Sequence, residues 1–130
     1  FTAFRFSPQV VKFMEYRYLG KTGLQVSVLS LGSWLTFGNQ ITDAVAEDLM
    51  KIAYEAGVNF FDNAEGYAFG QSETVMGKAL KNLGWDRTSY IVSSKVFFGS
   101  RRNPMPNQTG LSRKHIVEAC HEALSRLQTD

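Results

Sequence analysis

The sequence predicts an α/β protein built from parallel β-α-β units. Short apolar runs rich in β-branched and aromatic residues alternate with three longer segments whose apolar residues recur at helical spacing. Gly57 and Gly84 follow the first two helical segments, where helices commonly end. A repeated succession of strand and helix is typical of a parallel sheet with right-handed crossovers.

A β-hairpin is expected ahead of these units. Residues 15–19 and 24–28 are rich in apolar and β-prone side chains, and Gly23 lies in the turn between them. Residues 28–31 then continue as a short strand that ends at Gly32.

The first helical segment has Thr42 or Asp43 as its cap and ends before Gly57. A buried strand follows at 58–61 and ends at Asp62. The predicted apolar stripe of this helix consists of Val45, Leu49, Ile52, Ala53 and Ala56.

Two further helices complete the pattern. The second is expected to open at Ser72, and the strand at 90–94 leads from it to Lys95. The third is expected to be capped by Ser112. Their apolar positions are Val75, Met76, Ala79, Leu80 and Leu83 in the second helix, and Ile116, Ala119, Cys120, Ala123, Leu124 and Leu127 in the third.

This pattern alone fits either a doubly wound sheet or a (β/α)₈ barrel. The first strand is not followed by a G-x-G-x-x-G turn, which favours the barrel. A barrel of this kind takes roughly 250 residues. The 130 residues of the chain supply about three of its eight units, so we expect the barrel to be incomplete here.

Composition and charge fit a soluble globular domain, with 44% apolar and 20% charged residues. The net charge of +2 predicts neither nucleic-acid binding nor attachment to a membrane surface, and no segment is apolar enough for membrane insertion. The lone Cys120 excludes an internal disulfide and favours a reducing, cytoplasmic setting. Residues 1–13 contain no acidic side chain and are expected to form a poorly ordered tail, whereas 14–130 form the domain.

Three side chains at strand ends are candidates for chemistry. Asp62 and Lys95 follow successive strands, and Tyr67 lies in the loop after Asp62. In a barrel such positions meet at one face. An ammonium beside a phenol stabilises the phenolate and makes the phenol a better proton donor, while a carboxylate keeps the lysine charged. The set could protonate a carbonyl oxygen without a metal; the alternative is an Asp–Lys ion pair beside a packing tyrosine.

The remaining titratable side chains predict no further site. His115 and His121 lie about 240° apart around their helix, so they are not expected to share a metal and are placed at the surface. Cys120 falls in the apolar stripe and is expected in the core.

Four motifs resemble the aldo-keto reductase family. Residues 32–38 (GSWLTFG) and 59–67 (NFFDNAEGY) resemble the family as a whole. Residues 94–97 (SKVF) and 110–116 (GLSRKHI) resemble its voltage-gated potassium channel β-subunit branch, of the shaker type. The similarity runs from about residue 14 to residue 130.

The resemblance implies a (β/α)₈ TIM barrel preceded by a β-hairpin, with NADPH or NADP as cofactor. Asp62, Tyr67 and Lys95 match three of four catalytic positions, with Tyr67 as the proton donor, and the fourth would lie beyond Asp130. The residues matching cofactor contacts near the nicotinamide are Ser33, Trp34, Gln40 and Asp62. The branch often has threonine where Ser33 stands, and Trp-Gly-Gly where 98–100 read Phe-Gly-Ser.

The resemblance also implies two functions. One is reduction of small aldehydes and ketones by an NADP-dependent enzyme. The other is that of a cytoplasmic β subunit that regulates a voltage-gated potassium channel, uses bound NADPH as a redox sensor, and lies at the membrane only through the channel α subunits. Members of the branch form homotetramers. We expect no turnover from the 130-residue chain by itself, since an open set of three strands does not enclose a dinucleotide.

Overall fold

The computed structural model describes residues 14–130, and the tail predicted for residues 1–13 lies outside the described residues. The strands are β1 Tyr16–Tyr18, β2 Gln25–Ser27, β3 Leu31–Gly32, β4 Phe60–Asp62 and β5 Ile91–Ser93. The α-helices are α1 Asp43–Glu55, α2 Gln71–Leu83 and α3 Arg113–Leu127. Short helical turns are η2 Thr36–Gln40, η3 Tyr67–Gly70 and η4 Arg87–Ser89.

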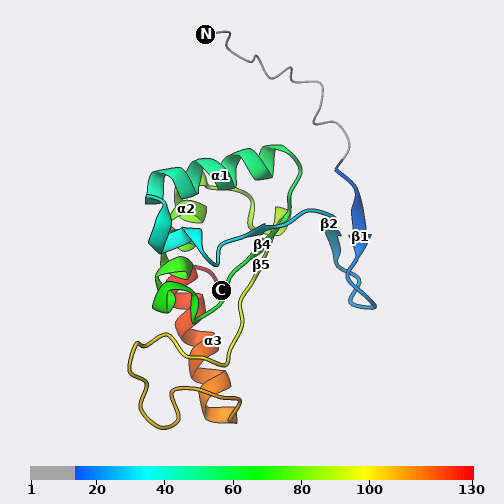
Figure 1. The fold of residues 1–130 in the computed structure, drawn as a ribbon. Coiled ribbons are helices and arrows are strands. Elements are labelled where there is room, and N and C mark those ends of the chain that lie inside the picture. The colour runs from blue at the N-terminus through cyan, green and yellow to red at the C-terminus, as the bar shows by residue number, and fades with distance from the viewer. Residues whose placement is uncertain (1–13) are drawn as a thin grey trace.

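The predicted β-α-β units are confirmed by a parallel sheet in the order β3-β4-β5. Leu31 pairs with Phe61, and Phe61 pairs with Val92. Helix α1 connects the first two strands of this sheet and α2 connects the last two (Figure 1). The strands described within residues 14–130 form this open sheet and a separate hairpin, and they do not close into a barrel.

The predicted hairpin is also confirmed, with β1 antiparallel to β2. Its position is fixed at the start of β4. The Tyr16 hydroxyl donates to the Gly57 carbonyl at 2.7 Å, and the Ser27 N–H donates to Asn59 Oδ1 at 2.8 Å. The hairpin therefore contacts the amino-terminal end of the parallel sheet and leaves its carboxyl end free.

Capping residues define two of the helix starts as predicted. The Thr42 hydroxyl accepts a hydrogen bond from Val45 N at 3.3 Å, and the Ser112 hydroxyl accepts one from His115 N at 3.1 Å. Helix α2 begins at Gln71, one residue before the predicted Ser72, whose buried hydroxyl instead donates to the Ser33 carbonyl at 3.4 Å.

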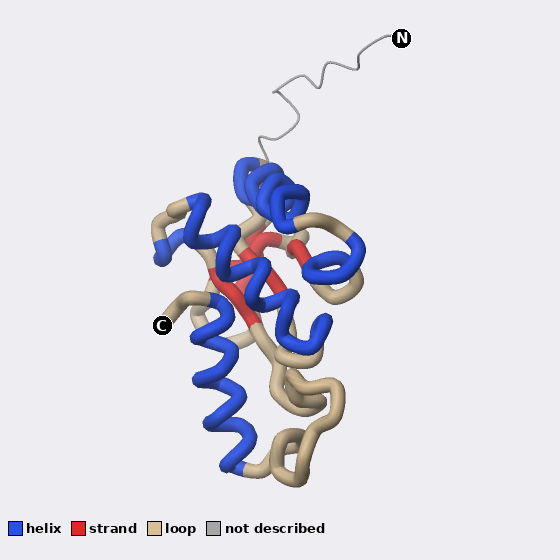
Figure 2. Tube along the Cα trace, turned by 90° about the vertical axis from the view of Figure 1, so that its left-hand side faces the viewer, coloured by secondary structure: helices blue, strands red, loops and turns tan. Residues whose placement is uncertain are grey.

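The core lies between the sheet and the helices. Phe61 of β4 is fully buried at its centre, and α2 packs against both α1 and α3 (Figure 2). Because side chains alternate along a strand, Phe60 and Asp62 point to the face opposite Phe61. The buried cluster contains Phe37, Ala46, Met50, Val58, Phe61, Val75, Met76, Ala79, Leu80, Tyr90 and Leu127.

The predicted apolar face of α1 is wrong for its large side chains, although Ala53 packs against the core as predicted. The buried residues of the helix are Ala46 and Met50, whereas Val45, Leu49 and Ile52 are exposed by 44%, 39% and 63%. Small Ala46 lets the helix approach the neighbouring α2, and the larger side chains are left on the outer face, which no described element covers.

Three predictions on α3 are wrong for a related reason. His115 is buried, with 6% of its surface exposed, whereas Cys120 and Ile116 are exposed rather than in the core. The buried face of α3 repeats every four residues through His115, Ala119, Ala123 and Leu127. Alanine at the two middle positions allows close packing on α2, and this register turns Cys120 outward. His121 is exposed, as predicted.

Across residues 14–130, each helix is too short or too polar to reach from one side of a bilayer to the other.

The contact between α2 and α3 depends on Gly77. A Cβ atom at this position would lie 2.3 Å from the Arg126 carbonyl oxygen and 2.6 Å from the Leu127 carbonyl carbon. Both are backbone atoms near the end of α3, so a side chain could fit only if the two helices moved apart.

We therefore expect Gly77→Ala to lower the free energy of unfolding by about 1–3 kcal/mol, since overpacking outweighs the better helix propensity of alanine. Urea denaturation would measure the change. Lys81→Ala, on the exposed side of the same helix, is the control and should be near neutral. Equal stability of the Gly77→Ala variant and the parent would contradict the close approach.

Candidate active site

The carboxyl ends of β3, β4 and β5 bring the predicted site residues together. Asp62 is the last residue of β4 and lies between Gly32 and Ser93 in the strand register. Ser33 follows β3 directly, Lys95 lies two residues after β5, and Tyr67 begins η3. Parallel strands place their carboxyl ends at one edge of the sheet, so residues far apart in sequence meet there.

Lys95 is the centre of this group. Its Nζ donates to both carboxylate oxygens of Asp62, at 2.8 and 2.7 Å, and to the Asn63 carbonyl at 2.7 Å. It also lies 3.3 Å from the Tyr67 hydroxyl oxygen. The convergence of acid, phenol and amine expected from the sequence is thus present in the structure.

Hydrogen bonds from the neighbouring strands hold Asp62. The Ser93 hydroxyl donates to Asp62 Oδ1 at 2.6 Å. The Ser33 hydroxyl and backbone N–H both donate to the Asp62 carbonyl, at 2.9 and 3.2 Å. Ser33 is fully buried, and its two hydrogen bonds connect the ends of β3 and β4.

Tyr67 is fixed by its ring and by an unusual turn. The ring stacks on Trp34 with centroids 6.1 Å apart, and Lys95 Nζ lies 5.0 Å from the Tyr67 centroid. The next two residues, Ala68 and Phe69, have φ values of 48° and 54°. Such left-handed backbone costs about 1 kcal/mol or more per non-glycine residue, and it concentrates at functional sites.

An apolar cavity of about 450 Å³ opens in front of the phenol and the ammonium. Its walls include four aromatic side chains, one of them the phenol of Tyr67. The lining residues are Trp34, Ala64, Glu65, Gly66, Tyr67, Lys95, Phe97 and Phe98. A small organic molecule seated here would meet the Tyr67 hydroxyl and the Lys95 ammonium beside apolar walls, which suits a carbonyl group on an apolar body.

The electrostatics keep the Lys95 ammonium charged. Partial burial would lower the pKa of Lys95, but its hydrogen bonds to Asp62 and Tyr67 and the charges of these groups raise the pKa above the usual 10.5. The side chain is 52% exposed, so solvent still screens the pair. At neutral pH the lysine is a cation beside the phenol.

Gln40 is the predicted site residue that the structure does not bring into this group. It lies at the exposed end of η2, and none of the hydrogen bonds found within residues 14–130 joins its side chain to Asp62, Tyr67 or Lys95. A cofactor contact at Gln40 stays a prediction.

Two buried residues of the site were missed from the sequence. Glu65 is 2% exposed and its Oε1 accepts from the N–H groups of Phe97 and Gly99, and His115 Nε2 lies 3.2 Å from the same oxygen. The spacing of His115 with Ala119 and Ala123 could have revealed that it faces the core. Within the described residues, no group of three or more His, Cys, Asp or Glu side chains is arranged to hold a metal.

The structure thus defines an α/β protein whose parallel sheet brings a carboxylate, an ammonium and a phenol together at its carboxyl edge, beside an apolar cavity. Residues 28–130 match the model of the Aldo/keto reductase family. The chain belongs to this family.

Two curated relatives carry channel names. One, "Putative voltage-gated potassium channel subunit beta" from Schizosaccharomyces pombe, is 52% identical over 117 residues, which cover 89% of this chain and 34% of the relative. The other, "Probable voltage-gated potassium channel subunit beta" from Arabidopsis thaliana, is 50% identical over 117 residues, or 90% of this chain and 35% of the relative. The chain thus spans about a third of the length of these relatives.

The raised pKa of Lys95 predicts how stability changes with pH. A lysine whose folded pKa exceeds its unfolded pKa contributes stability fully below the unfolded value and loses it as the pH rises through the folded value. We expect the free energy of unfolding of the parent to fall above about pH 10. The Lys95→Met variant should show a smaller fall, because it lacks the contribution of Lys95 deprotonation. Urea denaturation from neutral to alkaline pH measures it. Lys78→Met, which removes an exposed lysine of α2, should keep the full decline; an identical decline in the Lys95 variant would refute the linkage.

Proposed function

We propose that residues 14–130 are the first part of a (β/α)₈ barrel that reduces aldehydes and ketones with NADPH. The observation that carries the proposal is the Tyr67 hydroxyl, 3.3 Å from the Lys95 ammonium at the wall of an apolar cavity. Family membership supports an oxidoreductase. The structural alternative is an ion pair of Asp62 and Lys95 beside a packing tyrosine. It does not explain why Lys95 also contacts the Tyr67 hydroxyl at the wall of a cavity.

Two features support continuation of the sheet into a barrel. Strands β3 and β5 are its edges within the described residues, so each has one side without a strand partner. Beside β5 lies a groove of about 230 Å³ whose walls include Val92 and Val96 from the β5 region and Cys120 and Leu124 from α3. A further strand and its side chains would fill this groove and cover the α3 face that is exposed here.

The chemistry of the site fits the nicotinamide end of the cofactor. The indole of Trp34 is 66% exposed at the cavity edge and offers a flat apolar surface. Asp62 presents its carboxylate at the same sheet edge, and buried Ser33 supports the Asp62 backbone from behind. We assign Ser33, Trp34 and Asp62 to this end of the cofactor, with Gln40 further from the centre. When bound, NADPH would supply the hydride for the carbonyl carbon.

Side chains of the protein would supply the proton that the carbonyl oxygen receives. A substrate carbonyl oxygen that lies in the cavity next to the Tyr67 hydroxyl would receive the phenolic proton as negative charge develops on this oxygen. The Lys95 ammonium would stabilise the phenolate that remains, because it lies within hydrogen-bonding distance. Asp62 would act as a positioning residue that keeps Lys95 charged and aimed at the phenol. Trp34 and the other apolar walls would exclude water.

The decisive variant is Tyr67→Phe, which removes only the proton donor. The protein for the test is a complete barrel, made by joining residues 14–130 to the remaining part of the Schizosaccharomyces pombe relative. We expect kcat for propanal to fall by about 10²–10⁴-fold, measured by NADPH absorbance, with NADPH binding retained by fluorescence titration. Tyr18→Phe, in the exposed hairpin strand β1, is the matched control and should keep full activity.

Unchanged carbonyl reduction in the Tyr67→Phe barrel would show that another group supplies the proton and would refute the assignment. Residues 1–130 alone provide the second control. We expect no NADPH oxidation from them, because the described strands form an open sheet.

A second function is favoured by the names of the two relatives. We propose that the complete protein also acts as a β subunit of a voltage-gated potassium channel, as a homotetramer that reports the redox state of its bound nucleotide. The same barrel should co-purify with the cytoplasmic tetramerisation domain of such a channel, and size-exclusion chromatography with light scattering gives the assembly state. The Tyr67→Phe variant should still bind, since it loses only a hydroxyl inside the cavity. Absence of the complex with both proteins would contradict this role.

A further inference from the structure

Phe97 and Phe98 form one wall of the candidate substrate cavity, called the Phe wall below. Their rings meet edge to face with centroids 5.0 Å apart, and 50% and 76% of their surfaces are exposed. Gly66, next to Tyr67, lies against this wall, and a Cβ atom there would be in van der Waals contact with Phe98 Cβ at 3.4 Å. The position of the Phe wall therefore sets the width of the cavity beside the phenol.

Glu65 holds the backbone of this wall. Its Oε1 accepts hydrogen bonds from Phe97 N at 2.6 Å and Gly99 N at 2.8 Å, on both sides of Phe98. The backbone N–H of Glu65 donates to the Lys95 carbonyl at 3.2 Å. A single buried residue thus ties the Phe wall to the segments that carry Lys95 and Tyr67.

His115 completes the contact from α3. Its Nε2 lies 3.2 Å from Glu65 Oε1, and the two side chains are 8% and 3% exposed. Since Glu65 Oε1 already accepts from two backbone N–H groups, we assign it the acceptor role in this contact too, with Nε2 as the donor. The capping hydroxyl of Ser112 fixes the first turn of α3 and with it the place from which His115 reaches Glu65.

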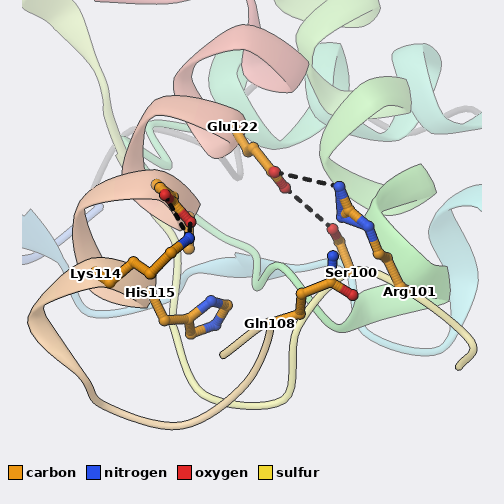
Figure 3. A pocket seen from close by; sticks show the side chains of 8 residues that line it. Ser100, Arg101, Gln108, Lys114, His115 and Glu122 are labelled. Carbon is orange, nitrogen blue, oxygen red and sulfur yellow. Dashed lines mark hydrogen bonds and ion pairs between the residues drawn. The ribbon is translucent and has the colours of Figure 1, made fainter. Parts of the chain in front are cut away.

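The loop that follows the Phe wall, residues 99–110, is closed at its base by a backbone hydrogen bond. A second cavity lies between this loop and α3, next to His115. Gly110 N donates to the Phe97 carbonyl at 2.7 Å, and a Cβ atom on Gly99, with φ of +77°, would lie 2.4 Å from the Gln108 carbonyl oxygen. The cavity behind has a volume of about 100 Å³. Figure 3 shows His115 projecting from α3 toward the loop that carries Ser100 and Gln108.

We infer that Glu65 and His115 are positioning residues that fix the Phe wall and so determine which carbonyl substrates bind well. This inference rests on the proposed reductase function, because it assigns a role within the same cavity. In the part of the chain that the structure describes, neither side chain forms a hydrogen bond with the Tyr67 hydroxyl or the Lys95 ammonium. Loss of either side chain should therefore make the Phe wall more mobile and weaken the binding of substrates that contact it, while proton transfer from Tyr67 is unaffected.

The test compares His115→Leu, which removes the donor, with His115→Gln, which retains an N–H donor, in the complete barrel described above. For benzaldehyde, whose ring would contact the Phe wall, we expect KM to rise about 10-fold in His115→Leu and to recover within about 3-fold in His115→Gln. For propanal, KM should change by less than about 2-fold, and kcat should stay within about 3-fold for both substrates.

Hydrogen exchange gives a readout that needs no activity. The Phe97 and Gly99 amides should exchange at least about 5-fold faster in His115→Leu than in the parent, with an intermediate rate in His115→Gln. Lys114→Ala, one residue earlier on α3, removes an exposed ion pair with Glu118 and is the matched control. It should change neither the exchange nor KM.

The inference is overturned if the amides of folded His115→Leu exchange as in the parent, or if KM rises equally for benzaldehyde and propanal together with a fall in kcat. Glu65→Gln, which conserves shape and weakens the acceptor, decides the matter if His115→Leu does not fold. Failure of both variants to fold would also overturn it, because the pair would then support the whole fold rather than the wall. If the parent barrel reduces neither aldehyde, the proposed reductase function fails, and the exchange rates of the Phe97 and Gly99 amides still test whether Glu65 and His115 fix the Phe wall.

Discussion

The parallel register of β3, β4 and β5 sets Gly32, Asp62 and Ser93 side by side, and the contacts of the candidate site begin from this row. Ser93 reaches the Asp62 carboxylate sideways because the two residues are register partners. A slip of one residue would turn Asp62 to the face occupied by Phe61 and carry a carboxylate into the apolar core. Burial of Phe61 therefore maintains the orientation of the acid, and through it the place of Lys95.

The second constraint is that each acidic side chain of the site region needs hydrogen-bond donors or a cation beside it. Two groups can be distinguished, the buried glutamates and the partly exposed Asp62. Glu73 is fully buried and accepts from Ser94 and from Arg126, whose guanidinium Nε lies 2.6 Å away. Glu65 is equally buried and takes three donors on one oxygen. Asp62 is instead 30% exposed in its side chain and paired with a half-exposed lysine. Buried acids with several donors hold backbone and helices in place, whereas the pair of Asp62 and Lys95 stays in contact with solvent.

The sequence predicted those features that depend on local pattern and missed those that depend on which neighbour a helix meets. Strand runs, the caps Thr42 and Ser112, and the meeting of Asp62 with Lys95 follow from alternation and from the geometry of parallel strands. The face of α1 and the burial of His115 do not, because Val45 and Ile116 are as apolar as a core requires. Alanines at the close helix contacts selected the buried faces, and a helical apolar pattern does not distinguish a tight contact from a wide one. Glu65 was missed because an acid between small residues gives no periodic signal.

The turn after Tyr67 connects stability with chemistry. Ala68 and Phe69 adopt left-handed backbone that is unfavourable for both, yet the segment is held by Tyr67 N to the Ala64 carbonyl at 3.1 Å and by the stacking of Tyr67 on Trp34. Phe69 also lies under the Arg102 guanidinium, 4.9 Å from its ring centroid. These contacts offset the strain and aim the phenol at Lys95. On the other side of the cavity, the Phe wall is held by Glu65 from behind. Tyr67 and the Phe wall are thus fixed by different sets of contacts, so the loop at 97–110 can change while Asp62, Tyr67 and Lys95 keep their geometry.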